Sequence, residues 1–460
     1  MQFKEKRKSP LSVIFGLIVL LLIVGSAYLH LSPAFEKNKP NIIADSNIYW
    51  NLKSKIDITI EDESGIKYYK VIFNDGQKDI VLSQKVLEEN KSNISFQISP
   101  PKLDMFYKGD NVTLRIEAID NSKWNLLEGN KAVKTIAVNL DTKKPVANVI
   151  SNSRYIQRGG SAVVVVKVKD VNLEDAYITF NEDVKFKLQP YYEKDYFVAL
   201  VAWPMHIDEF NRVNLIAYDK ANNKTITKVP FYIQKKNVKI DKIKLSKKFI
   251  NNISASVLEQ SFEETPGNTK DIFLYSNTVL REKNIQTIET VAKKAIDNDM
   301  VENFNIKAFK RLRGSKTVAK YGDYRHYFLD GEKINQAWHL GIDWASVKKA
   351  PIRVTNDGKV IFRDYLGLYG NSIIIDHGMG LSSLYAHTSS QLVEVGEEVT
   401  KNQKIANTGA TGAVFGDHLH FGILIQGVEV NPIEWMDKNW IKVRITDILT
   451  NAKKQIDGNS

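Results

Sequence analysis

The sequence predicts a mainly β, multidomain protein with an N-terminal transmembrane helix. Three observations support this fold class. One long uncharged run lies near the N-terminus, short β-rich runs follow it, and the last third of the chain alternates apolar stretches with glycine-rich turns. The 460 residues are 43% hydrophobic and 25% charged, which is typical of folded protein and sufficient for more than one core.

Residues 11–31 are the predicted transmembrane anchor, because an uncharged helix of this length can cross a ~30 Å hydrocarbon core. Basic residues precede the run: Lys4, Lys6, Arg7 and Lys8. Residues 1–10 are therefore expected to be a cytoplasmic tail, and the rest of the chain to be exported. The alternative is a cleaved signal peptide, since the small residues at 25–27 suit a cleavage site. The favoured localisation is a single pass of the inner membrane, with the bulk of the chain on the periplasmic side.

Residues 38–141 and 142–235 are predicted to form two Ig-like β-sandwich modules. Short β-rich runs recur there between Asn, Asp and Gly, without long helical periods. The stretch Ile116–Asp120 resembles Leu215–Asp219, which gives a weak repeat of about 100 residues, the size of one Ig-like module. The alternative is one larger β-domain.

Residues 236–319 are predicted to be a helical connector. Apolar residues at 288, 291, 292 and 295 follow helical spacing, and Thr269 is a candidate cap after Pro266-Gly267. The lysine-dense stretch 234–248 is interpreted as a solvated linker or helix face. A second amphipathic helix is expected in the tail, 438–460.

The composition limits the chemistry. There is no cysteine, which excludes disulfides, thiol nucleophiles and cysteine–metal sites. The net charge of +11 suits an anionic partner such as a membrane surface or an envelope polymer, or simply a lysine-rich solvated surface. No zinc-finger or RNA-binding pattern is present, so nucleic acid is not an expected partner.

Five of the eight histidines lie between residues 339 and 420. His418 and His420 flank Leu419 in a β-type segment, so both imidazoles should project from one face while Leu419 turns into the core. His339 and Asp343 are four residues apart, and Gly341 between them favours a turn entering a strand over a helix. Together with one histidine of the pair, they would supply three protein ligands. Three ligands leave a position for water, as in catalytic zinc sites.

These motifs resemble those of a known family. HLGIDWA (His339–Ala345) and DHLHFGI (Asp417–Ile423) are similar to the H-x-x-x-D and H-x-H motifs of the M23 (LytM/lysostaphin-like) zinc metallopeptidases. The segment Gly370–Ser390 resembles the family's central region, including its Y-A-H. The resemblance extends from the strand Tyr321–Phe328 to Asn431-Pro432, which sets the predicted M23 peptidase domain at 320–437.

The resemblance implies an antiparallel β-sheet domain with a zinc groove. By position, His339, Asp343 and His420 would bind Zn²⁺, and His387 and His418 would be catalytic. Tyr385 is expected to pack beneath His387, and His377 to make a structural hydrogen bond. Asp417 stands where many members have Pro, and Gly422 where Glu or Gln is common, which concerns the shape of the groove rather than the ligands.

The implied activity is zinc-dependent endopeptidase hydrolysis of peptide bonds in peptidoglycan stem peptides or cross-links. The implied partners are peptidoglycan and, through the N-terminal helix, the inner membrane. A regulatory protein partner and a homo-oligomer are both left open. The alternative function is a non-catalytic M23-fold protein that binds the wall or acts as a scaffold or regulator. A second hypothesis is that the region 236–320 covers the groove and restrains the enzyme.

Overall fold

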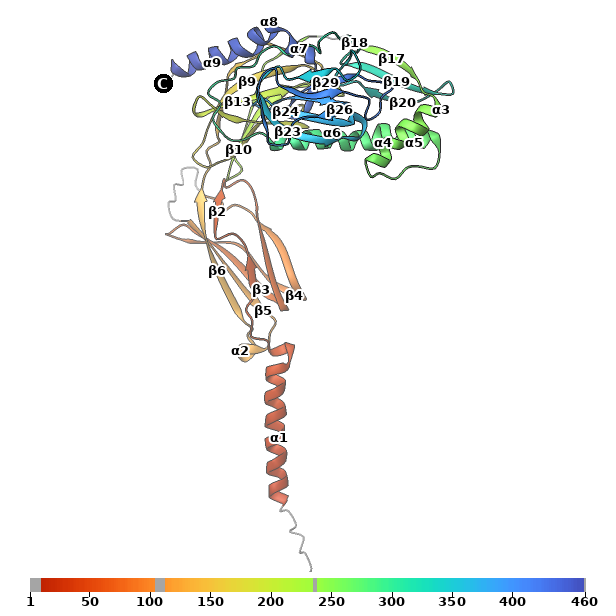
Figure 1. Cartoon of the computed structure of the whole chain (residues 1–460). Coiled ribbons are helices and arrows are strands. Elements are labelled where there is room, and N and C mark those ends of the chain that lie inside the picture. Colours follow the sequence, from red (N-terminus) through yellow and green to blue (C-terminus); the bar gives the residue numbers. More distant parts are fainter. Residues whose placement is uncertain (1–9, 104–111, 235–237, 459–460) are drawn as a thin grey trace, which may run out of the picture. The chain divides into compact units, whose positions relative to one another are not determined.

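The computed structural model describes residues 10–103, 112–234 and 238–458, and it is mainly β, as predicted (Figure 1). The predicted cytoplasmic tail lies almost entirely outside the described residues. The chain forms two compact units. The first contains the described residues up to Lys144, with Tyr218–Asn223, and the second contains Pro145–Ala217 and the described residues from Lys224 onward.

The apolar run forms helix α1 (Pro10–Leu31), of 22 residues. At about 1.5 Å per residue its length is ~33 Å, enough to cross a bilayer core. Its large apolar side chains are exposed rather than packed against the protein. Such a helix is typical of a membrane anchor or a signal sequence.

The first unit contains a six-stranded sheet in which β4 pairs with β3 and the other strands follow the order β1-β3-β5-β6-β2. Its core contains Trp50, Ile58 and Phe73, which are fully buried. The alternating burial along β5 shows that one face of this strand is turned into the core. The strands are β1 (Asn41–Ile43), β2 (Asn47–Trp50), β3 (Ile56–Asn74), β4 (Asp79–Ile98), β5 (Val112–Asp120) and β6 (Lys131–Leu140). Short helical turns are η1 (Pro33–Phe35) and α2 (Trp124–Leu127).

Two four-stranded sheets make up most of the next module, in the orders β11-β10-β14-β15 and β12-β13-β9-β7. The run Ala162–Val166 in β9 is buried on both faces, which explains its continuous apolar sequence. The strands are β7 (Val146–Asn152), β8 (Tyr155–Gln157), β9 (Ser161–Lys169), β10 (Leu173–Phe180), β11 (Val184–Lys187), β12 (Gln189–Tyr191), β13 (Glu193–Ala202), β14 (Val213–Asp219), β15 (Lys224–Lys228) and β16 (Tyr232–Gln234). The Ig-like assignment of both modules remains a prediction.

The C-terminal domain is built on an eight-stranded sheet, β18-β21-β29-β25-β24-β23-β27, with β30 paired to β29. Two three-stranded sheets accompany it, β22-β28-β26 and β17-β19-β20. The strands are β17 (Lys239–Lys244), β18 (Lys316–Ala319), β19 (Asp323–Leu329), β20 (Glu332–Trp338), β21 (Ile342–Ala345), β22 (Pro351–Arg353), β23 (Gly358–Tyr365), β24 (Asn371–Asp376), β25 (Leu381–Ala386), β26 (Thr388–Gln391), β27 (Glu398–Val399), β28 (Lys404–Thr408), β29 (Leu419–Ile425) and β30 (Val428–Val430).

Helices precede and follow this domain. The preceding segment is α3 (Lys247–Phe249), η2 (Ile250–Ser254), α4 (Ala255–Gln260), α5 (Thr269–Tyr275), η3 (Ser276–Leu280) and α6 (Arg281–Lys294). The tail is α7 (Pro432–Met436), α8 (Lys438–Ile441), η5 (Lys442–Thr446) and α9 (Asp447–Asp457). The cap of α5 is Asn268, whose side chain accepts a hydrogen bond from the Asp271 amide, rather than Thr269.

The interpretation of 234–248 as a solvated linker or helix face is wrong for its central part. Strand β17 pairs in parallel with β19 over six residues, from Lys239 with Asp323 to Lys244 with Phe328. Its lysines are exposed on an edge strand, where charge opposes pairing with other chains. The high lysine content of 234–248 is therefore that of an edge strand in this part of the stretch.

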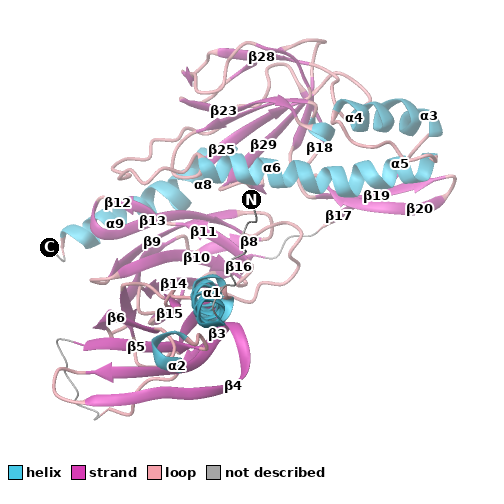
Figure 2. Ribbon diagram, turned by 90° about the horizontal axis from the view of Figure 1, so that it is seen from below, coloured by secondary structure: helices cyan, strands magenta, loops and turns pink. Residues whose placement is uncertain are grey.

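Two cores hold the second unit together. One packs the helices α3–α6 against one face of the eight-stranded sheet, with Phe249, Phe273 and Ile288 buried against Leu384 and Leu424. Helix α6 runs along that face (Figure 2). The other core is continuous from the module of β7–β16 into the opposite face of the eight-stranded sheet.

Polar contacts reinforce the second of these junctions. Glu434 accepts hydrogen bonds from the Ser161 amide and from the side chain of Gln157, at 2.9 and 2.8 Å. Gln426 exchanges two hydrogen bonds with the backbone of Lys187. The module of β7–β16 is thus part of the same compact unit as the eight-stranded sheet.

Candidate metal centre and groove

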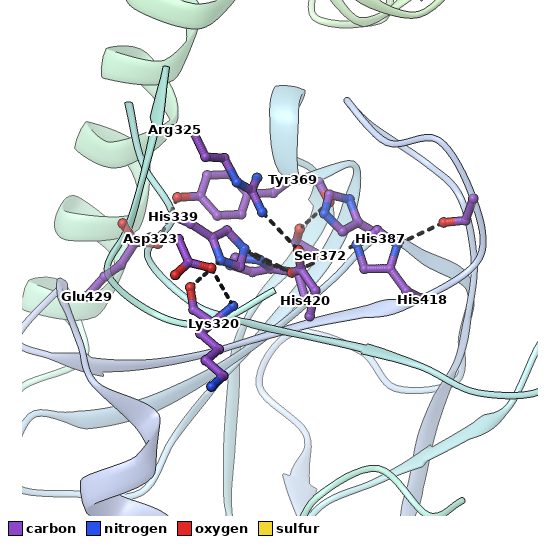
Figure 3. A network of polar contacts seen from close by, with 12 residues as sticks. Lys320, Asp323, Arg325, His339, Tyr369, Ser372, His387, His418, His420 and Glu429 are labelled. Carbon is purple, nitrogen blue, oxygen red and sulfur yellow. Dashed lines mark hydrogen bonds and ion pairs between the residues drawn. The ribbon is translucent and has the colours of Figure 1, made fainter. Parts of the chain in front are cut away.

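Three side chains meet on one face of the large sheet, as the sequence predicted for His339, Asp343 and His420. Figure 3 shows His339 and His420 among their polar contacts. His339 Nε2 lies 3.0 Å from Asp343 Oδ1 and 3.2 Å from His420 Nδ1. Asp343 Oδ1 lies 2.8 Å from His420 Nδ1. All three residues are buried. Two imidazole nitrogens and one carboxylate oxygen at these separations form a donor set suited to Zn²⁺.

The β-sheet register brings these residues together across 77 positions of sequence. β21 pairs antiparallel with β29, and Asp343 lies directly opposite His420. His418 and His420 share a face, while Leu419 and Phe421 are buried in the core on the other face. His339 is at the turn between β20 and β21. The turn and the alternation are both as predicted.

Glycine is required at position 341 because the backbone of this turn passes close to His420 and to the backbone of Phe421. A Cβ at this position would lie 2.4 Å from His420 Nε2 and 2.8 Å from the carbonyl oxygen of Phe421. Both separations are too short for a carbon atom, so no other residue fits without displacing the ligand strand.

Outer contacts orient two of the three side chains. His339 Nδ1 lies 2.8 Å from the Lys320 carbonyl oxygen, to which it donates, so Nε2 keeps its lone pair for the centre. Arg325 Nη2 lies 3.3 Å from Asp343 Oδ2, which leaves Oδ1 toward the histidines. This arrangement fixes which atom of each side chain is offered to a metal.

The electrostatics favour the protonation states that a metal needs. Burial opposes ionisation of Asp343, but His339 and His420 outweigh it and hold the pKa of this carboxyl well below its usual range. Burial lowers the pKa of His420 to about 4, against the opposing effect of Asp343. At neutral pH the carboxyl is therefore ionised and His420 is neutral, as metal ligands are.

His387 and His418 lie next to this cluster. Their ring centroids are 4.9 Å apart, and His418 Nε2 is 3.9 Å from Asp343 Oδ1. His387 Nδ1 contacts the Thr411 carbonyl oxygen and His418 Nδ1 that of Gly416, both at 2.8 Å. With Nδ1–H donated to the backbone, each ring keeps Nε2 as a free base or donor. Burial lowers the pKa of His387 well below its usual range, with further lowering by His418 and His420.

The backbone at His387 is strained, with φ of +60°. The left-handed region is unfavourable for a residue with a Cβ, and such strain is typical of functional positions. It turns the side chain out of strand β25, which ends at Ala386, toward His418.

These residues form part of the lining of a groove of about 470 Å³. One side of the groove comes from the eight-stranded sheet and its loops, including Val414 and Phe415. The other side comes from the end of β17 and the helical segment after it, through Ile243, Leu245, Phe249 and Phe273, with Asn277 and Arg281. The helical segment is thus a wall of the groove. The hypothesis from the sequence placed the region 236–320 over the groove as a cover, not as part of its lining.

Three further residues of the site were not singled out from the sequence. Arg325 lies in a segment that was recognised, but nothing in its spacing pointed to Asp343. The Tyr369 ring packs edge-on against His420 at 5.5 Å, and its hydroxyl donates to Glu429 Oε1 at 2.7 Å. No pattern in the sequence links Tyr369 and Glu429.

The prediction that Tyr385 packs beneath His387 is wrong. Tyr385 contacts Phe421 at 5.4 Å on the other face of the sheet, because side chains alternate along β25. His377 makes the structural hydrogen bonds expected of it, to the Asp357 carbonyl oxygen and to Ser383 Oγ, at 2.7 and 2.8 Å.

Comparison with known proteins agrees with this geometry. Residues 337–432, which contain all five of these site residues, match the model of peptidase family M23. The C-terminal domain belongs to peptidase family M23. The M23 match begins after the helical wall and ends at the start of α7, so it covers the sheet but not the wall.

The relatives of the M23 domain include proteins with different named roles. The chain is 39% identical to the DD-carboxypeptidase/endopeptidase Mpg of Neisseria meningitidis over 95 residues, which are 21% of this chain and 22% of Mpg. It is 36% identical to the murein hydrolase activator EnvC of Escherichia coli over 131 residues, 28% of this chain and 29% of EnvC. The matches thus span less than a third of either relative. Among solved structures, the catalytic domain of lysostaphin from Staphylococcus simulans is 25% identical, with a TM-score of 0.24, covering 27% of this chain and 94% of that domain.

Proposed function

We propose that this protein is a zinc-dependent endopeptidase that hydrolyses peptide bonds in peptidoglycan stem peptides or cross-links. The observation that carries the proposal is the convergence of Nε2 of His339, Oδ1 of Asp343 and Nδ1 of His420 within about 3 Å of one another. Two further imidazoles face this cluster in a groove large enough for a peptide segment.

The five residues divide into two roles. His339, Asp343 and His420 would hold the zinc, since two nitrogens and one oxygen leave a position open for chemistry. Bound zinc would supply Lewis acidity to the scissile carbonyl and to an attacking water. His387 and His418 would act on protons and on developing negative charge, because both Nε2 atoms are left unused by the backbone contacts at Nδ1.

Peptidoglycan is the proposed substrate because the relatives are named for this chemistry. Mpg is named as a carboxypeptidase and endopeptidase, and EnvC as an activator of murein hydrolases. The complete set of ligand and catalytic positions favours hydrolysis over an activator role, since an activator needs no ordered set of donors at the centre of its groove.

The helix α1 would anchor this activity in the inner membrane, with the remainder of the chain in the periplasm. The support is a helix of 22 residues whose apolar side chains lie exposed in the part of the chain that the structure describes. Membrane fractionation of the full chain tests this. Recovery of a shortened, soluble protein would show that the helix is a cleaved signal sequence instead.

The activity is tested by digestion of purified peptidoglycan with the full chain in detergent, loaded with zinc. Loss of cross-linked muropeptides, or shortening of stems, is expected with the native chain. Removal of zinc by a chelator and the His339→Ala variant should each abolish it. Identification of the new termini by mass spectrometry names the bond.

The alternative is a wall-binding, scaffold or regulator protein. It predicts that the chain sediments with peptidoglycan, that His387→Ala and His418→Ala leave this binding unchanged, and that no bond is cut under any zinc loading. That combination of results would overturn the proposal of hydrolysis.

A further inference from the structure

The helical wall of the groove carries two polar side chains, Arg281 and Asn277, that are hydrogen-bonded to each other. Arg281 begins α6 and Asn277 lies one turn earlier in η3, and both line the groove together with the proposed zinc ligands. Arg281 Nη2 donates to Asn277 Oδ1 at 2.7 Å. This bond orients the Asn277 amide so that its Nδ2 is the remaining donor.

These donors are not satisfied within the described protein. Asn277 is 5% exposed, and its Nδ2 has no hydrogen-bond partner. Nε of Arg281 and Nε of Arg325, which also lines the groove, are buried and without a partner as well. Buried donors are nearly always hydrogen-bonded, so unpaired donors on residues that line a groove favour an acceptor being received there.

The wall is held firmly in place. Asn284 Oδ1, one turn after Arg281, accepts a hydrogen bond from the Leu368 amide at 3.0 Å and is buried against Gly367. Leu280 and Ile288 are buried in the core shared with the catalytic sheet. Arg281 and Asn277 are therefore fixed relative to the metal centre, which suits recognition of one group at one place.

The charges in the groove favour an anion. The carboxylate of Asp343 is paired with one guanidinium group, that of Arg325. The same carboxylate would also bind the zinc. Within the described residues no carboxylate lies within ion-pair distance of Arg281. Glu429 is an acidic group that interacts electrostatically with Arg281. Burial raises the pKa of Glu429 to about 7, and Arg281 opposes this effect. Glu429 is therefore only partly ionised at neutral pH and neutralises Arg281 only in part. With zinc bound, the charges of Arg281, Arg325 and the ion would outweigh those of the two carboxylates that line the groove, Asp343 and Asp417.

We propose that Arg281 and Asn277, with Arg325, which is paired with the metal ligand Asp343, form a subsite for a free carboxylate of the peptide substrate. A planar carboxylate offers two acceptor atoms, which matches guanidinium and amide donors better than a neutral carbonyl does. The group recognised is a terminal carboxylate close to the bond that is cut. This inference rests on the proposed function for its substrate, but the subsite itself belongs to the helical wall and not to the M23 motifs.

The test compares two probes that differ only in this group: N-acetyl-D-alanyl-D-alanine and its C-terminal amide. Their equilibrium binding to the full chain in detergent is measured with and without zinc, by competition against a fluorescent peptide. We expect the carboxylate to bind at least ~10-fold more tightly than the amide, because hydrogen bonds to an ionised acceptor are roughly twice as strong as those to a neutral one.

Variants identify the residues that are responsible. Arg281→Met should remove most of the preference for the carboxylate, Asn277→Ala part of it, and Arg281→Lys should keep some. Lys294→Met is the matched control, because Lys294 is an exposed cation in the last turn of the same helix and outside the groove lining. The preference is a ratio measured on one preparation, so it does not depend on the fraction that folds.

The outcomes separate this inference from the proposed function. Equal binding of both probes to the native chain, or a preference that survives Arg281→Met, would overturn the subsite even if peptidoglycan is cleaved. A preference that is lost in Arg281→Met but kept in Lys294→Met would establish the subsite even if no bond is hydrolysed. In that case the groove recognises wall peptides without cutting them.

Discussion

Replacement of Gly341 by alanine should destroy the proposed zinc site while leaving the rest of the fold intact. A Cβ at this position would lie 2.4 Å from His420 Nε2 and 2.8 Å from the carbonyl oxygen of Phe421. Ordinary contacts of carbon are ~3.5 Å. Either the His420 ring or the backbone of β21 must therefore move by about 1 Å.

A movement of this size exceeds what a zinc site tolerates. Zinc–nitrogen bonds are about 2.0–2.1 Å long, and a working site keeps them within about 0.2 Å. One of three protein ligands would be lost or badly placed, which should weaken zinc binding at least ~100-fold, or about 2.7 kcal/mol.

The assay is titration of the metal-free chain with Zn²⁺ in competition with a chromogenic chelator. Gly416→Ala is the control, because Gly416 also lines the groove but its Cβ would meet no atom within 4 Å. It should bind zinc as the native chain does. Zinc affinity of Gly341→Ala within threefold of native would refute the reasoning that close approach to His420 dictates glycine here.

Three further predictions follow from the same geometry. His418→Ala should keep zinc binding within about threefold and lower the cleavage rate at least ~100-fold, since His418 is proposed to act on protons and not on the metal; loss of zinc from this variant would make His418 a ligand. Glu429→Gln should stabilise the fold at pH 8 by up to about 3 kcal/mol and change it little at pH 4. In the folded native chain the pKa of Glu429 is raised to about 7. The stability that the neutral carboxyl confers is therefore complete below the ordinary pKa of 4.5 and is lost as the pH rises through 7. A shift in melting temperature between variant and native chain that is equal at pH 4 and pH 8 would contradict this. Residues 315–460 alone should melt more than about 10 °C below the full chain or aggregate, because removal of α3–α6 exposes the core around Leu384 and Leu424; an equally stable and active fragment would show that the helical wall is dispensable.

The site could be predicted from the sequence wherever a local rule fixed the answer. Strand alternation placed His418 and His420 on one face and Leu419 in the core. Gly341 ruled out a helix between His339 and Asp343, and the structure has a turn there. These rules left open which histidine of the pair is a ligand, and the resemblance to M23 peptidases implied His420. The register of β21 with β29, which no local rule predicted, places Asp343 opposite His420.

The parts that could not be predicted depend on tertiary packing. Arg325 in β19 contacts Asp343 in β21. These two strands belong to different sheets, and no periodicity in the sequence predicts that their side chains meet. The same holds for the edge-on packing of Tyr369 against His420. The error at Tyr385 has the opposite origin, since alternation along β25 would have assigned its side chain to the far face.

The helical wall bears on how access to the groove is controlled. If residues 236–320 were a removable cover, their contacts with the eight-stranded sheet would be few and polar. Instead Phe273, Leu280 and Ile288 are buried in one core with the sheet, and Asn284 holds the loop at Gly367. Separation of this segment would expose a large apolar face, which costs about 25 cal/mol for each Å². Restraint by opening and closing of the wall is therefore unfavourable, and control of the groove is better sought in what binds between the wall and the sheet.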